Sequence, residues 1–276
     1  KNQLGGSEKI LVGKDLSKTD LSKINLTGQN LSGTNLSGTA EAFKDLRKVD
    51  LTDTILRSAN LSFTNLSGQD LSGKDLTGVN FHGANLENVN LSDTIVPKEV
   101  QYISNSQCES SGQFLPREFR SLYSAHKCAE EVIQNEKIIT DFSDTNLKDA
   151  TMNFSEYHYL HHIDFSGADL TGIELSKIGF RNCNFIGTKL NDSRMSEATF
   201  FYVDFINAEM KNSQFTGVPF FQNVSFHNAE IIDGYFEKPV FIDTDFSNAN
   251  LMNTIIDEPF MAGDIHSECK NNQICN

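Results

Sequence analysis

The feature that most constrains the fold is an apolar residue at every fifth position. The series begins at Leu11 and runs to Val96, and Glu41 is the one interruption. An α-helix needs a hydrophobic period of about 3.6 and a β-strand a period of about 2, so neither element keeps this series on one buried face. The repeating unit must instead be one side of a coil in a solenoid, where stacked coils bury the apolar positions.

The residues around each apolar centre follow a pattern that indicates tight turns. Asp or Asn usually precedes the centre, and 13 of the 18 glycines stand two places after it, as Gly28 and Gly187 do. Glycine suits a turn residue with positive φ, and Asp or Asn side chains accept hydrogen bonds from nearby backbone amides. The sequence therefore predicts a turn after every short side of the coil.

Segments such as Gln29-Asn30-Leu31-Ser32-Gly33 and Ala84-Asn85-Leu86-Glu87-Asn88 resemble the pentapeptide-repeat family, whose unit is Ala-(Asp/Asn)-Leu-X-X. The resemblance implies an all-β fold, a right-handed quadrilateral β-helix solenoid with four pentapeptides in each coil. The central Leu or Phe would point inward.

The second half of the chain allows a check of this expectation, because a square coil repeats every 20 residues. Every fourth centre is then a phenylalanine on two neighbouring sides: Phe165, Phe185, Phe205, Phe226 and Phe246 on one, and Phe180, Phe200, Phe220 and Phe241 on the other. The other two sides are mostly aliphatic. One extra residue between Phe220 and Phe226 predicts an outward bulge at Gln222 to Val224.

Some positions depart from the family pattern. The small residue two places before the centre is replaced in the first block by long polar side chains: Lys14, Lys44, Lys74, Gln29 and Gln69. A buried ammonium is costly, so we expect these side chains to reach outward through the corners and the first block to be the looser one. Glu41 would be an interior carboxylate, so we expect a local distortion that turns it outward.

The repeat divides the chain into four parts. We expect an N-terminal cap and first repeat block over residues 1–96, a non-repeat insertion over 97–139, a second block over 140–261 and a C-terminal cap over 262–276. Apolar residues at helical spacing predict one amphipathic helix, the helical insertion, over 117–136. The insertion either leaves and rejoins one continuous tube, which we favour, or separates two short tubes.

The five cysteines lead to an expectation about compartment. Cys183 occupies a small interior position and should be a buried free thiol. The other four lie outside the repeats, and disulfides within each segment, Cys108 with Cys128 and Cys269 with Cys275, are the simplest pairing. Together with a first residue that is Lys rather than Met, they favour a processed, extracytoplasmic protein, either secreted, on the cell surface, or in a periplasm or lumen.

The residues that could carry chemistry are few. His158, His161 and His162 with Asp164 could meet on one helical turn and bind Zn or Cu, or they could belong to a solvated loop, which we favour. His266 with Cys269 and Cys275 has metal-ligand spacing too, but a disulfide fits better. No catalytic grouping stands out from the recurring Asp and Ser of the repeat, so we expect no enzyme, cofactor or metal.

The charge limits the possible partners. The chain carries a formal net charge of −14, and residues 140–276 hold 8 basic against 20 acidic side chains. Nucleic acid and anionic lipid surfaces should repel such a chain, and no segment is apolar over the length of a membrane span. We expect a non-enzymatic structural or protein-protein interaction scaffold. The alternative, implied by the quinolone-resistance members of the family, is an acidic DNA mimic that inhibits a type II topoisomerase.

Overall fold

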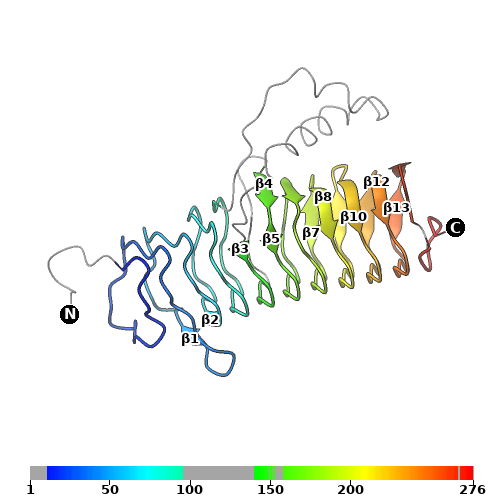
Figure 1. Cartoon of the computed structure of the whole chain (residues 1–276). Coiled ribbons are helices and arrows are strands. Elements are labelled where there is room, and N and C mark those ends of the chain that lie inside the picture. Colours follow the sequence, from blue (N-terminus) through cyan, green and yellow to red (C-terminus); the bar gives the residue numbers. More distant parts are fainter. Residues whose placement is uncertain are drawn as a thin grey trace, which may run out of the picture. The chain divides into compact units, whose positions relative to one another are not determined.

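The computed structural model describes residues 11–95, 140–148, 150, 152, 158–266 and 268–275. These residues form short parallel strands and turns, an all-β parallel solenoid (Figure 1). The part of the chain described here holds no helix, and therefore none that could span a membrane. The predicted insertion 97–139 and its predicted helix 117–136 lie outside the described residues.

Each side of a coil is built from local interactions that the repeat supplies. The residue before the centre is commonly Asp or Asn, whose Oδ1 atom accepts a hydrogen bond from the backbone amide two residues later, as from Ser32 to Asn30 at 3.0 Å. The residue two places after the centre is left-handed, with φ of 65° at Gly187 and 59° at Asp192. Space does not require glycine at 187, because an added Cβ would meet nothing within 4 Å, so the backbone conformation favours it there. The predicted turns are confirmed.

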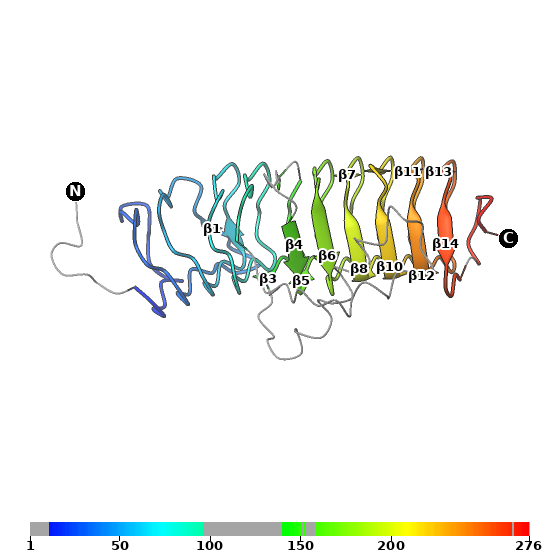
Figure 2. The ribbon, with the colours of Figure 1, turned by 90° about the horizontal axis from the view of Figure 1, so that it is seen from above.

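The strands form four parallel sheets, one for each side of the coil. Figure 2 shows the largest, of six strands. It contains β4 (His158–His161), β6 (Ile178–Arg181), β8 (Thr199–Asp204), β10 (Phe220–Ser225), β12 (Val240–Asp245) and β14 (Phe260–Ala262). A four-stranded sheet contains β7 (Arg194–Ser196), β9 (Gln214–Thr216), β11 (Tyr235–Glu237) and β13 (Ile255–Asp257). Two pairs complete the set, β1 (Lys44–Asp45) with β2 (Thr64–Asn65) and β3 (Thr140–Asp141) with β5 (Ile163–Asp164).

The two repeat blocks stack directly on each other. Asn80 bridges Asp141 and Asn85 bridges Asn146, both in parallel register. The rings of Phe81 and Phe142 stack with centroids 5.0 Å apart. The coils before residue 96 and after residue 139 are therefore one continuous stack, the arrangement that we favoured from the sequence.

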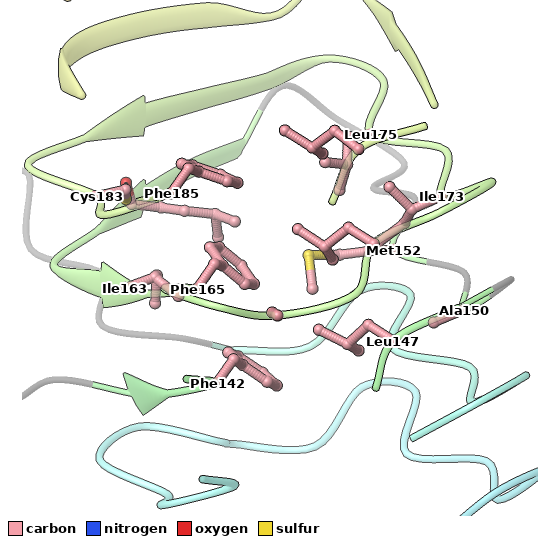
Figure 3. Close-up of a cluster of buried hydrophobic side chains, with 14 of the residues drawn as sticks. Phe142, Leu147, Ala150, Met152, Ile163, Phe165, Ile173, Leu175, Cys183 and Phe185 are labelled. Carbon is pink, nitrogen blue, oxygen red and sulfur yellow. The ribbon is translucent and has the colours of Figure 1, made fainter. Parts of the chain in front are cut away.

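The core consists of side-chain ladders that run from coil to coil. Figure 3 shows Phe142, Phe165 and Phe185 on one side of the interior and Leu147, Met152 and Leu175 on the other. Consecutive rings of this ladder stack with centroids 4.9 to 5.3 Å apart, and a second ladder joins Phe180, Phe200, Phe221 and Phe241. The first predicted phenylalanine ladder is confirmed, and the second is confirmed except that Phe221 takes the place of Phe220.

The predicted bulge at Gln222 to Val224 is wrong. β10 keeps the same register with β8 and β12 on both sides of Asn223, and Gln222 and Val224 lie opposite Phe201 and Val203. The extra residue lies earlier, in the corner that contains Val218, which is left-handed with φ of 62°. Phe221 therefore occupies the interior position predicted for Phe220. The ring of Phe220 stacks instead on that of Phe201, with centroids 5.2 Å apart.

The long polar side chains of the first block do not all reach outward as expected. The Lys44 ammonium donates hydrogen bonds to the backbone carbonyls of Leu16, Ser17 and Thr19, and the Lys74 ammonium donates to Leu51 O at 2.7 Å. The Gln69 amide likewise donates to Leu46 O at 2.8 Å. These side chains satisfy turn carbonyls of the neighbouring coil, a role that Thr188 fills in the second block by donating to Phe165 O. Lys14 is exposed.

Candidate interaction surface

One pentapeptide of the first block leaves the stack, near β1 in Figure 1. Asn35 bridges Asn60, 25 residues later, whereas Asn60 bridges Asn80, 20 residues later. The additional residues include a tight turn in which Thr39 and Ala42 exchange backbone hydrogen bonds of 3.0 and 3.1 Å. Glu41 lies in this turn and is exposed, so its predicted outward distortion is confirmed.

The outward loop ends at Phe43, whose side chain packs on a corner of the stack. Phe43 is 48% exposed, and its ring meets that of Phe63 edge to face with centroids 6.3 Å apart. The ring of Phe63 in turn meets the His82 imidazole at 5.2 Å. Phe63 is left-handed with φ of 51°, a conformation that is costly for an aromatic residue. The corner and the loop therefore hold each other in place through aromatic contacts.

Glycines make room for the large side chains along this corner. Phe63, Gly83, Asp144 and Gly167 follow one another in successive coils. The backbone amide of each donates to the carbonyl just before the next one, as Phe63 does to His82 and Gly83 to Ser143. A Cβ atom at Gly83 would collide with the Phe63 ring, and one at Gly167 would collide with the Asp144 carboxylate. Each large side chain thus lies over the glycine of the next coil.

A pocket of about 450 Å³ opens between the loop and the stack. We call it the loop pocket. Its floor includes an asparagine ladder, in which Asn85 bridges both Asn65 and Asn146 and accepts a hydrogen bond from Asn146 Nδ2 at 3.2 Å. The full lining is Phe43, Asn65, Gly83, Ala84, Asn85, Asp144 and Asn146. The pocket therefore combines an aromatic wall, a polar floor and one carboxylate.

Beside the pocket, the structure brings together a serine, a histidine and an aspartate. Ser143 Oγ lies 2.8 Å from His82 Nδ1 and donates to Asp141 Oδ1 at 2.6 Å. A hydroxyl has one hydrogen. Because the Ser143 hydroxyl directs its hydrogen at Asp141, the His82 ring must be the donor to Ser143 Oγ. A nucleophilic serine needs the opposite direction, with histidine accepting its proton. The serine stands between the other two groups, and this order does not activate it.

A similar histidine-serine pair occurs further along the same side. His227 Nδ1 lies 2.6 Å from Ser247 Oγ, and the Ser247 amide donates to Asp245 Oδ1 at 2.8 Å. In both pairs the histidine and the serine stand two places after residues that pair across adjacent coils, Asn80 with Asp141 and Ser225 with Asp245. Both pairs are therefore contacts between neighbouring coils.

The residues of the predicted histidine cluster do not lie on one helical turn. His158 and His161 lie in β4, His162 follows at a left-handed corner and Asp164 is in β5. Burial, together with Arg181 and His162, lowers the pKa of His161 to about 4. No group of three or more His, Cys, Asp or Glu side chains able to hold a metal occurs among the described residues. The side chain of His158 lies outside them.

The cysteines can be placed in part. Cys269 and Cys275 form a disulfide, and Cys183 is a buried free thiol, both as expected. Burial raises the pKa of Cys183 to about 12, which keeps this thiol protonated and unreactive. Cys108 and Cys128 lie outside the described residues, so their disulfide stays a prediction.

The additional acidic side chains of the second block do not form one row. Asp144, Asp192, Glu197 and Asp243 are left-handed corner residues with φ between 48° and 59°. They follow centres in four different ladders, so each stands at a different corner of the stack. Asp192 accepts a hydrogen bond from Asn212 Nδ2 at 2.8 Å, and Asp243 accepts one from the Asp264 backbone amide at 2.9 Å.

The repeat pattern of the sequence does not predict the loop pocket. Its lining residues come from segments up to about 100 residues apart, and each of them looks like an ordinary residue of the five-residue repeat. One signal was present, since Phe63 stands two places after a centre, where glycine is common. An aromatic residue at that place indicates a corner with additional contacts.

Comparison with protein families gives two matches. The pattern described as pentapeptide repeats (8 copies) matches residues 11–40, 45–73 and 59–95. The pattern described as a pentapeptide repeat region matches residues 158–231. Together these ranges cover more than half of the 276 residues. No curated protein matches the chain by sequence.

Comparison with solved structures gives matches of low identity, three of which follow. HetL, a pentapeptide repeat protein involved in heterocyst differentiation regulation in the cyanobacterium Nostoc sp. strain PCC 7120, is 17% identical, with 88% of this chain and 82% of HetL covered and a TM-score of 0.29. Full-length QnrB1, a plasmid-mediated fluoroquinolone resistance protein, is 13% identical, with 92% and 90% covered and a TM-score of 0.22. Rfr23, from the cyanobacterium Cyanothece 51142, is 12% identical, with 51% and 68% covered and a TM-score of 0.16. At these identities we transfer no partner or activity.

Proposed function

Because the chain belongs to the pentapeptide-repeat family, we propose that it is a non-enzymatic protein-protein interaction scaffold that works outside the cytoplasm. The observation that carries the proposal is the outward loop, which presents a half-exposed Phe43 beside the loop pocket on an otherwise regular stack. Exposed aromatic residues next to a pocket are common anchors of protein interfaces.

The chemistry of the described residues supports binding over catalysis. The Ser143, His82 and Asp141 side chains stand in an order that leaves the hydroxyl unactivated. A solenoid holds its surface side chains at a fixed spacing of about 4.8 Å per coil, so it offers a preformed surface that loses little entropy on binding.

The disulfide supports the proposed compartment. Cys269 and Cys275 close a short loop at the end of the repeats, where Ile265 and Ile274 pack against the core. Disulfides of this kind persist in oxidising compartments and are rare in a reducing cytoplasm. Fractionation of cells that express the full-length gene tests this part, and recovery of the protein with the cytoplasm alone would contradict it.

Site-directed photo-cross-linking tests the scaffold function. A photoreactive phenylalanine analogue at Phe43 should give one discrete protein adduct in an extract of the source organism, and excess unlabelled wild-type chain should abolish it. The analogue at Ile186, which is exposed on a plain side of the stack, is the matched control and should give none. Failure to cross-link from Phe43, Ile186 and Ile255 alike would contradict the proposal.

A further inference from the structure

The loop pocket has a chemistry that selects its ligand by charge. The Asp144 carboxylate is 65% exposed, and no Lys or Arg among the described residues pairs with it; His82 Nδ1 lies 3.8 Å from its Oδ2 atom. A carboxylate or phosphate on a ligand would be repelled at this place. A cation would gain a charge-assisted hydrogen bond.

The other walls favour an organic cation over a metal ion. Phe43 contributes an aromatic surface, and the asparagine ladder uses its Oδ1 atoms in part to hold turns, as Asn146 does with the Lys148 amide at 3.1 Å. One carboxylate with amides does not make a metal site, and no candidate metal group occurs in the described parts of the chain. Aromatic faces attract cationic side chains, and guanidinium more often than ammonium.

The arrangement is held in place before any ligand arrives. Gly83 lies under the Phe63 ring, and Gly167 lies under the Asp144 carboxylate. Phe63 positions Phe43 through their edge-to-face contact, and the asparagine ladder fixes the floor. A pocket of this size has room for one extended side chain and its flanking backbone.

We propose that the loop pocket binds an arginine side chain from a basic segment of the partner protein. The Asp144 carboxylate pairs with the guanidinium group, and Phe43 covers its flat face. This inference rests on the proposed scaffold function and names the chemistry of the partner. The net charge of −14 adds long-range attraction toward a basic partner, and that attraction weakens as salt increases.

The test uses the full chain and the peptide Gly-Ser-Arg-Ser-Gly, followed through the backbone amide signals of Gly83, Asn85 and Asn146 in NMR titrations. We expect saturable shifts at these three amides. The matching lysine peptide should bind at least about threefold more weakly, and the citrulline peptide, which is similar in shape but uncharged, should not bind. Equal affinity for the lysine peptide, or binding of the citrulline peptide, would overturn the guanidinium assignment.

Two variants locate the site, and one controls for overall charge. Asp144→Asn should weaken the arginine peptide at least about fivefold, and Phe43→Ala should remove the preference for arginine over lysine. Asp192→Asn makes the same change at a left-handed corner away from the pocket and should leave affinity unchanged. Asparagine tolerates this conformation, so both Asp variants should fold. Equal weakening by Asp144→Asn and Asp192→Asn would overturn the proposal. If the photoreactive analogue cross-links a partner from another side of the stack and the arginine peptide does not bind, the scaffold function stands and the loop pocket is refuted as the arginine site.

Discussion

At the scale of single residues, the corners of the coils carry the conformational cost of the fold. Glycine, asparagine and aspartate occupy most of the left-handed positions, and each adopts this conformation at low cost. Val218 adopts the left-handed conformation at a higher cost, because its branched side chain crowds the backbone at φ of 62°. It stands in the corner that accommodates the extra residue, so the strain and the irregularity of the repeat coincide.

Exchanging valine and glycine at two corners should therefore have opposite effects. Val218→Gly should stabilise the protein by about 1 kcal/mol, since relief of strain exceeds the entropy gained by the unfolded chain. Gly187→Val, at φ of 65° and with free space around it, should destabilise by about 1–2 kcal/mol. Urea denaturation measures both, and a loss of stability in Val218→Gly would contradict the assignment of strain.

At the scale of elements, the phenylalanine ladders connect each coil to the next. The ring of Phe205 lies between those of Phe185 and Phe226, with centroids 4.9 and 5.2 Å away, and Phe205 is completely buried. Leucine ladders occupy the same positions in the first block, where Leu36 is 1% exposed. The structure buries both kinds of ladder fully, so any difference in stability must come from packing contacts.

Truncations in the two blocks compare these contacts. Phe205→Ala should cost about 3–5 kcal/mol and Leu36→Ala about 2–3 kcal/mol in chemical denaturation, because the larger ring leaves the larger cavity and a looser first block would collapse further around the smaller one. Equal losses would argue against our expectation that the first block is the looser one.

The burial of His161 in β4 gives the protein a pH dependence. Its folded pKa of about 4 lies below the ordinary 6.5, so the unfolded chain binds the proton more strongly. The contribution of neutral His161 is complete above about pH 6.5 and is lost as pH falls toward 4, a loss of about 3 kcal/mol. His161→Phe should flatten the stability profile in this window, whereas His227→Gln serves as the control. An unchanged profile in His161→Phe would refute the assignment.

At the scale of the whole molecule, the continuous stack explains where cysteines are useful. Coils are held by backbone pairing and by ladders, and Cys183 is simply a small buried side chain within them. The Cys269–Cys275 disulfide instead lies beyond the last strand, around Lys270, which forms the last bridge of the stack among the described residues, to Asn250. A cross-link is most useful here because residues 271–275 form no bridge to another coil in the described part of the chain.

Thiol counting tests this distribution. Denatured, unreduced protein should show one free thiol, Cys183, with Cys108 and Cys128 paired as well as Cys269 and Cys275. Alkylation followed by mass mapping identifies each one. Five free thiols would contradict both the pairing and the proposed oxidising compartment.

The distribution of acidic residues leads to an expectation about topoisomerases. A DNA mimic requires rows of charge with duplex-like spacing, whereas Asp144, Asp192, Glu197 and Asp243 stand at four different corners. We therefore expect no inhibition of gyrase supercoiling by stoichiometric protein. Clear inhibition that is lost on reversing these four charges would establish the alternative function.

The sequence by itself determined the repeat, the inward ladders, the turns and the outward position of Glu41. Each depends on contacts within five residues or on repetition at 20, so counting along the chain is enough to find them. The exposed Glu41 followed from one carboxylate in an apolar series. The free thiol of Cys183 followed in the same way from its small interior position.

Tertiary structure alone decided the features that depend on register between coils. From the sequence, either Phe220 or Phe221 could be the inward phenylalanine of this coil. The pairing of β10 with β8 and β12 places Phe221 inside. The prolines 219, 239 and 259 do recur every 20 residues, a signal that the count of apolar centres overlooked. Lys44 turned inward because carbonyls of another coil compensate the desolvation of its ammonium. The loop pocket joins residues 43, 85 and 144, and a local pattern cannot show which distant corners come together.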